Sequence, residues 1–184
     1  MCSSLQWFNV NYCDLDGELP SEIGNLGNLT NLRLSYNGFE GTIPPEIFSA
    51  TKLKNFYAHD NDLEGTIPPA IGNLVSATDI SFSSNKLTGS IPGEAFGKLT
   101  SLQECYLREN KLEGKLPTQI GLLGASLRYF DARENQFTGK IPTQVGKLTT
   151  LRHFYLTRNH LSGSIPSEIA LCTNLSKFRV GKCL

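Results

Sequence analysis

The stretch Leu29–Pro44 reads LTNLRLSYNGFEGTIP, and Leu151–Pro166 reads LRHFYLTRNHLSGSIP. Both fit the frame LxxLxLxxNxLxGxIP, in which x is variable. The frame occurs seven times, and an eighth copy from Leu175 runs out at Leu184; the seven start at Leu5, Leu29, Leu53, Ala77, Leu102, Leu127 and Leu151. One such repeat cannot bury its own leucines, so the sequence predicts a solenoid in which neighbouring repeats bury them.

An asparagine column marks the period, with spacings of 24, 24, 25, 25 and 24 residues. An inward asparagine carries two N–H donors and a carbonyl acceptor. It can therefore satisfy backbone groups of a turn that leucines would leave unpaired. We expect a structural role, and no ligand contact, for Asn37, Asn61, Asn85, Asn110, Asn135 and Asn159.

The LxLxx part of the frame alternates, which predicts a short strand that pairs in parallel with its copies. Glycine and proline then turn the chain back. The two longer spacings arise from one extra residue between Pro92 and Phe96 and one between Ile120 and Leu127. Both insertions should lie on return segments, outside the sheet, where length is tolerated.

Over essentially its whole length the chain resembles the plant-type leucine-rich repeats of receptor-like kinase ectodomains, receptor-like proteins and polygalacturonase-inhibitor-like proteins. The resemblance implies an α/β repeat solenoid, a curved horseshoe with a parallel concave sheet and 3-10 or irregular convex return segments. We expect a single domain over residues 1–184, with seven full repeats, a truncated eighth and no terminal caps.

The sequence is compatible with more than one cellular compartment. The first residues, MCSSLQWFNV, have no signal-peptide pattern, and no apolar run approaches the roughly 18 residues of a membrane span. The chain either stays inside the cell or is a piece of a longer one, whereas the family resemblance implies an extracellular or plasma-membrane-associated place. Two N-glycosylation sequons, at Asn28 and Asn174, would matter if it is secreted.

Five cysteines leave two interpretations. Cys105 replaces a strand leucine and should be a small buried hydrophobe. Cys2 with Cys13 and Cys172 with Cys183 could form a disulfide at each end, or all four could be thiols at core positions. We favour thiols, because positions on opposite sides of a coil lie too far apart for a bridge. No CxxC supports a zinc site.

The sequence predicts no enzyme, cofactor or metal, because it contains no nucleotide-binding, zinc-protease or hydrolase motif. The best carboxylate pair, Glu109 and Glu134, follows arginines and fits a ladder of ion pairs. Net charge is zero, with 4 Lys+Arg against 10 Asp+Glu in residues 1–92 and 13 against 7 in residues 93–184. The zero net charge disfavours nucleic-acid binding. The unequal distribution of charge between the two halves makes the solenoid an electric dipole.

Side chains that point away from the core should line the concave face, which is the surface such solenoids use for binding. The middle of this face is bland, with Asp79, Ser81, Ser83 and Ser84. The C-terminal half is rich in tyrosine and arginine, the residue types enriched at binding hot spots. The candidate ligand-binding set is Tyr57, Tyr106, Arg108, Tyr129, Asp131, Arg133, His153, Tyr155, Arg158, Lys177 and Arg179, of which all but Tyr57 should form one contiguous patch.

Three functions remain in competition. The first is a receptor-like module that binds a protein or peptide, with a preference for acidic groups that arginine can pair with. The second is recognition of carbohydrate or cell-wall polymer, or enzyme inhibition, because Tyr57, Tyr106 and Tyr155 share one column that could stack on sugars. The third is a structural spacer within a larger receptor.

Overall fold

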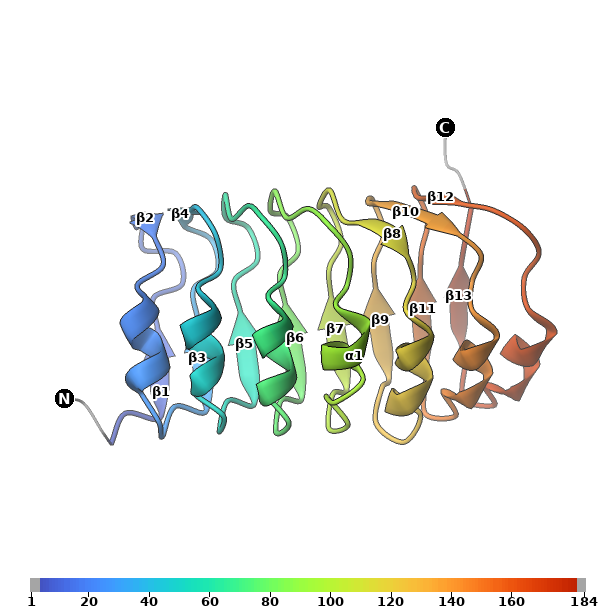
Figure 1. Ribbon diagram of the computed structural model, residues 1–184, viewed down its shortest axis with the longest axis horizontal. Helices are drawn as coiled ribbons and strands as arrows, with labels where there is room; N and C mark the ends of the chain where they lie inside the picture. Colours follow the sequence, from blue (N-terminus) through green and yellow to red (C-terminus); the bar gives the residue numbers. More distant parts are fainter. Residues whose placement is uncertain (1–3, 182–184) are drawn as a thin grey trace.

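The LxLxx stretch of each repeat forms a three-residue strand in the computed structural model, which describes residues 4–181. Eight such strands pair in parallel, in chain order, along the long axis of the molecule (Figure 1). The strands are β1 (Trp7–Asn9), β3 (Asn31–Arg33), β5 (Asn55–Tyr57), β6 (Asp79–Ser81), β7 (Glu104–Tyr106), β9 (Tyr129–Asp131), β11 (His153–Tyr155) and β13 (Lys177–Arg179). This confirms the predicted repeat solenoid with a parallel sheet.

After six of these strands, an asparagine forms hydrogen bonds to its own coil and to the preceding one. Nδ2 of Asn61 donates to the carbonyl oxygen of Leu34, one coil earlier, at 3.0 Å and to that of Ala58 at 3.2 Å. Its Oδ1 accepts the backbone N–H of Phe39 at 3.1 Å. Similar bonds are made by Asn37, Asn85, Asn110, Asn135 and Asn159. Turn groups next to these asparagines are thereby paired from coil to coil.

A short helix begins directly after each repeat proline and lies across the coil from the sheet (Figure 1). A proline has no N–H to leave unpaired, so it suits the start of a helix. The helices are η1 (Ser21–Asn25), η2 (Pro45–Ser49), η3 (Pro69–Asn73), α1 (Gly93–Phe96), η4 (Thr118–Leu123), η5 (Thr143–Lys147) and η6 (Ser167–Leu171). All are of the 3-10 type except α1.

Both insertions fall in these return segments, as predicted. The first coil with an extra residue replaces the 3-10 turn by α1, and the second extends η4 to six residues where η1 has five. The sheet register passes through both coils unbroken, since Ile80 pairs with Cys105 and Cys105 with Phe130. The return segments absorb the added length because they are not part of the sheet.

Short strands also form just after the asparagine, where only a turn was expected. They run along one edge of the solenoid, at the top of Figure 1, and pair in parallel as β2–β4 and β8–β10–β12. Extended backbone around the repeat glycine pairs adjacent coils with an offset of two residues from the repeat frame, since Gly17 lies opposite Phe39 and Gly114 opposite Phe137. The strands are β2 (Asp16–Glu18), β4 (Gly38–Glu40), β8 (Glu113–Lys115), β10 (Gln136–Gly139) and β12 (His160–Leu161).

Two of the three described cysteines lie in the core. Cys105 is fully buried, and Cys172 is buried with its Sγ 3.1 Å from the carbonyl oxygen of Val145. The prediction that Cys13 occupies a core position is wrong, because its side chain is exposed. Within residues 4–181, Cys13 has a coil packed against it on one side only. Cys2 and Cys183 lie outside the described residues.

Candidate binding site on the sheet

The first and third residues of each strand point away from the core, whereas the middle residue is buried in the six inner strands and partly buried in β1 and β13. Their side chains form the outer surface of the eight-stranded sheet, called the sheet face below. It is the surface to which the residue pattern assigned ligand binding. Every candidate residue from Tyr57 to Arg179 is an outward residue of a strand or lies within three residues after one.

Four rings of the candidate set form an aromatic cluster over β7, β9 and β11. The centroid of Tyr129 lies 4.8 Å from that of Tyr106, 5.1 Å from that of His153 and 5.5 Å from that of Tyr155. The rings of His153 and Tyr155 are stacked at 5.8 Å. The four rings thus pack against one another, and Tyr155 is only 6% exposed.

Arg133 and Asp131 form an ion pair at the edge of this cluster. Nε and Nη2 of Arg133 donate to the two carboxylate oxygens of Asp131 at 2.8 and 2.6 Å. Asp131 is 1% exposed, and the Arg133 guanidinium lies 5.0 Å from the Tyr155 ring centroid. The hydrogen bond to Asp131 raises the pKa of Arg133 and keeps it charged. Asp131 therefore positions Arg133 and has little surface left for a ligand.

The other cations of the set differ in what they already contact. Arg158 pairs with Glu134 of the preceding coil at 2.8 Å, whereas Arg179 lies over Tyr155 at 5.5 Å from the ring centroid. Arg108 is 3.7 Å from Glu109, too long for a hydrogen bond. Lys177 is exposed, in register with His153. The structure brings the rings, Asp131, Arg133 and Arg179 together, while Arg158 belongs to a separate ion pair.

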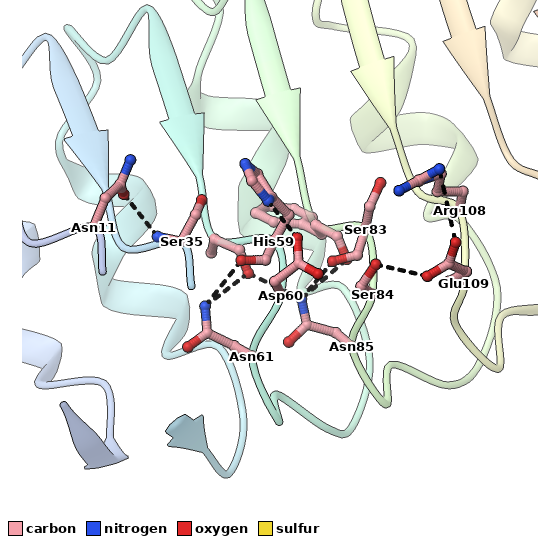
Figure 2. Close-up of polar contacts among 12 residues, drawn as sticks. Asn11, Ser35, His59, Asp60, Asn61, Ser83, Ser84, Asn85, Arg108 and Glu109 are labelled. Atoms are coloured by element: carbon pink, nitrogen blue, oxygen red, sulfur yellow. Dashed lines mark hydrogen bonds and ion pairs between the residues drawn. The ribbon is translucent and has the colours of Figure 1, made fainter. Parts of the chain in front are cut away.

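A hollow of about 320 Å³ opens on the sheet face beside this cluster. Six candidate residues line it: Tyr57, Tyr106, Arg108, Tyr129, Asp131 and Arg133. Five residues outside the candidate set line it too: Tyr36, His59, Asp60, Ser81 and Ser83. Figure 2 shows one rim, where His59 and Asp60 are paired at 2.8 Å and Arg108 and Glu109 lie beyond Ser83.

The coil whose outward residues looked bland is therefore the floor of the hollow. Ser81 and Ser83 are each 5% exposed, because the longer side chains of the coils on either side stand above them. A sequence signal was available: short residues at the outward positions of one repeat, with aromatic or basic residues at the same positions of both neighbours. The depth of a hollow on such a surface depends on the difference in side-chain length between neighbouring coils.

Burial favours the protonated form of Tyr57, Tyr106 and Tyr129, which line the hollow. It is the largest cause that raises the pKa of Tyr57, Tyr106 and Tyr129 above the usual value of 10.0. Nearby carboxylates act in the same direction, including Glu104 on Tyr106. The phenols are thus available as neutral hydrogen-bond donors and as ring surfaces.

The carboxylates near the hollow are already engaged by neighbouring side chains. Among residues 4–181, no three His, Cys, Asp or Glu side chains are grouped so that they could hold a metal. Glu109 accepts a hydrogen bond from Ser84 at 2.9 Å, and Glu134 pairs with Arg158 of the next coil. Because Arg133 pairs with Asp131 and not with Glu134, the predicted ladder of ion pairs is interrupted at Arg133. In the same span, no helix is long and apolar enough to cross a bilayer.

The two sequons differ in accessibility. Asn174 is exposed, and its Nδ2 donates to the carbonyl oxygen of Thr149 at 2.6 Å. Asn28 is partly buried, and its Oδ1 accepts a hydrogen bond from Nζ of Lys52 at 2.6 Å. Glycosylation at either position stays a prediction.

The chain is similar in structure to part of several plant receptor ectodomains. That of the membrane receptor kinase GASSHO1/SCHENGEN3 from Arabidopsis thaliana, in complex with CASPARIAN STRIP INTEGRITY FACTOR 2, superposes with a TM-score of 0.91 and 34% identity, over 94% of this chain and 20% of that one. The Arabidopsis receptor kinase HAESA, in complex with the peptide hormone IDA and the co-receptor SERK1, gives 0.92 and 31%, over 97% and 30%. PEPR1-AtPEP1 gives 0.78 and 28%, over 96% and 28%.

The chain thus spans less than a third of each of these structures. No curated protein matches it in sequence. The family model described as Leucine Rich Repeat matches residues 4–26, 28–50, 52–74, 126–148 and 150–172. Because these segments make up more than half of its residues, the chain belongs to the leucine-rich-repeat family.

Proposed function

We propose that the chain is a non-catalytic recognition module that binds a protein or peptide on its sheet face. The observation that carries the proposal is the hollow between Tyr57 and the aromatic cluster, because it combines ring surfaces, two arginines and buried hydroxyls in one concavity. Tyrosine and arginine are among the residues that most often dominate binding energy at protein interfaces. The HAESA ectodomain, whose fold this chain shares, is solved with a peptide hormone.

A preference for acidic groups is part of the proposal. Arg108 is partly exposed and Arg179 is exposed, and in the described structure neither makes a hydrogen bond to a carboxylate, although Arg108 lies 3.7 Å from Glu109 in an ion pair. An arginine that keeps its donors free can bind a carboxylate with two parallel hydrogen bonds. Arg133, by contrast, already gives its donors to Asp131.

The experiment is selection of a random peptide display library on the folded chain, followed by affinity measurements on the selected peptides. Arg108→Glu/Arg179→Glu reverses two charges on the sheet face. Lys98→Glu/Lys147→Glu reverses two exposed lysines on the helix side and is the matched control. We expect the first variant to lose the peptides and the control to keep them.

Equal binding to both variants would remove the sheet face as the site. Failure of the library to give any specific binder, together with capture of acidic oligosaccharides, would replace the proposal by carbohydrate recognition. If neither class binds, a structural spacer is the better description.

A further inference from the structure

The hollow contains a symmetrical arrangement that goes beyond a general binding surface. Tyr57, Ser81 and Tyr106 are paired in register on the adjacent strands β5, β6 and β7. At about 4.8 Å between neighbouring strands, the two tyrosines leave the sheet roughly 10 Å apart. A serine that is 5% exposed lies between them as the floor. The sheet thus holds two phenol rings on either side of a gap one coil wide.

The outer faces of both rings are already covered. The guanidinium of Arg33, on the coil before Tyr57, lies 5.3 Å from the Tyr57 ring centroid. Tyr129, on the coil after Tyr106, lies 4.8 Å from the Tyr106 centroid with the planes 35° apart. Among residues 4–181, neither ring has an aromatic or cationic contact on the Ser81 side. The faces that remain open are therefore the two that border the gap.

A flat ring fits this gap better than a branched side chain does. Stacked aromatic groups lie about 3.5–4 Å apart face to face, so a ring inserted between two others needs roughly 7–8 Å. A slight lean of the Tyr57 side chain toward Tyr106, whose hydroxyl is bonded to Glu104, would provide that separation. At about 320 Å³, the hollow is at the lower limit of ligand pockets, which suits one side chain of a larger ligand.

The floor also has an unused hydroxyl. The Oγ of Ser83 is buried and has no hydrogen-bond partner in the described structure, and Ser83 lines the hollow. A buried polar atom without a partner costs free energy, which a ligand atom that bonds to it would recover. His59 and Asp60 on the coil before Ser83, and Arg108 on the coil after it, border this serine (Figure 2). The inserted ring should therefore carry a polar atom at its edge.

We propose that the gap between Tyr57 and Tyr106, above Ser81 and Ser83, is an aromatic slot for one tyrosine or tryptophan side chain of a peptide ligand. The phenol or indole ring stacks between the two tyrosines, and its O–H or N–H donates to Oγ of Ser83. This inference rests on the proposed function, because it names the side chain that a peptide would insert.

The test uses N-acetyl-L-tryptophanamide as the probe and N-acetyl-L-leucinamide as its apolar control. Titration of the isotope-labelled chain is followed by the amide shifts of Ser81 and Ser83. We expect saturable binding of the first probe, with a Kd on the order of 1 mM, and none of the second. Tyr57→Ala and Tyr106→Ala should each weaken it about three- to tenfold, since each removes one stacking face.

Two further variants make the outcome unambiguous. Ser81→Phe should fill the slot with its own ring and abolish probe binding, while its melting temperature checks that the chain still folds. Tyr12→Ala is the control for non-specific stacking, because Tyr12 is 70% exposed and lies outside the hollow, against Tyr36. It should leave the affinity unchanged.

The aromatic slot is overturned if leucinamide binds equally well, if no saturable binding occurs, or if Tyr12→Ala abolishes the shifts. It is also overturned if Ser81→Phe binds the probe like the wild type. A selected peptide that binds Ser81→Phe with full affinity, yet is lost in Arg108→Glu/Arg179→Glu, would reject the slot while leaving recognition on the sheet face intact.

Discussion

The hydroxyl of Tyr106 donates a hydrogen bond to Oε2 of Glu104 at 2.6 Å, so two outward residues of the same strand fix each other on the sheet face. The bond orients the Tyr106 ring, which belongs both to the aromatic cluster and to the wall of the hollow. It also requires the phenol to keep its proton. Burial and the Glu104 carboxylate both raise the Tyr106 pKa above 10.0.

This shift predicts how stability depends on pH. The folded chain retains a phenol proton that the unfolded chain releases near pH 10.0, so the stabilisation is complete below that pH and is lost as the pH rises above it. Tyr106→Phe has no proton to release. We expect its melting temperature to fall less steeply than that of the wild type above pH 10.0. Parallel curves for the two proteins would contradict the prediction.

The ion pair between Arg133 and the buried Asp131 predicts that loss of this arginine lowers the stability of the fold far more than loss of an arginine in an exposed ion pair. Arg133→Ala leaves the carboxylate of Asp131, 1% exposed, without its charge partner. We expect the free energy of unfolding to fall by about 2–4 kcal/mol. Arg158→Ala is the matched control, because its ion pair with Glu134 is exposed and should contribute about 0–1 kcal/mol. Urea denaturation of both variants measures the difference, and equal losses would refute it.

Substitution in the asparagine column should lower the free energy of unfolding by more than the loss of side-chain volume explains. Asn110→Ala removes bonds from Nδ2 to the carbonyl oxygens of Phe82 and Leu107 and the bond from the Leu87 N–H to Oδ1. Since these backbone groups are buried, we expect a loss of about 2–4 kcal/mol. Asn73→Ala, at an exposed position at the end of η3, should change stability by less than about 0.5 kcal/mol. A similar melting temperature for both variants would argue against a structural role for the column.

Cysteine exposure predicts an order of labelling. Burial raises the thiol pKa of Cys105 and Cys172, so both are poor in thiolate as well as shielded from reagents. Iodoacetamide should label exposed Cys13 in the native chain and the other two after unfolding. Peptide mass spectrometry at successive times assigns the sites. Labelling of Cys105 as fast as Cys13 would show that the strand position of Cys105 opens to solvent.

The fold could be predicted from the sequence because its main contacts repeat. A residue at a given strand position pairs with its own counterpart one coil away, as Leu32 does with Phe56, so the pattern of one repeat describes the packing of the next. The extra residues of the 25-residue coils were placed correctly for the same reason. The second sheets were missed, because their strands have no hydrophobic alternation and depend on backbone alignment between coils.

The candidate site could be predicted in part. Tyrosine and arginine in outward positions indicated the face that carries the hollow, and six of the residues that line it belong to the candidate set. The floor was not found, because the short side chains of Ser81 and Ser83 form a depression only between taller neighbours. Nor did the sequence show that Asp131 and Tyr155 would be covered by their neighbours.

By itself, the sequence determined the repeat period, the parallel sheet, the inward asparagines and the face that carries tyrosine and arginine, since these follow from side-chain direction within one coil. The tertiary structure decided which of those side chains remain available. Arg133 closes on Asp131, the rings of three coils pack together, and two serines between taller neighbours become a hollow. Each outcome depends on contacts between side chains of the same face or of adjacent coils, and these contacts are set by the size, length and charge of the side chains. The repeat frame specifies only which positions point inward and which point outward, so it does not predict these contacts.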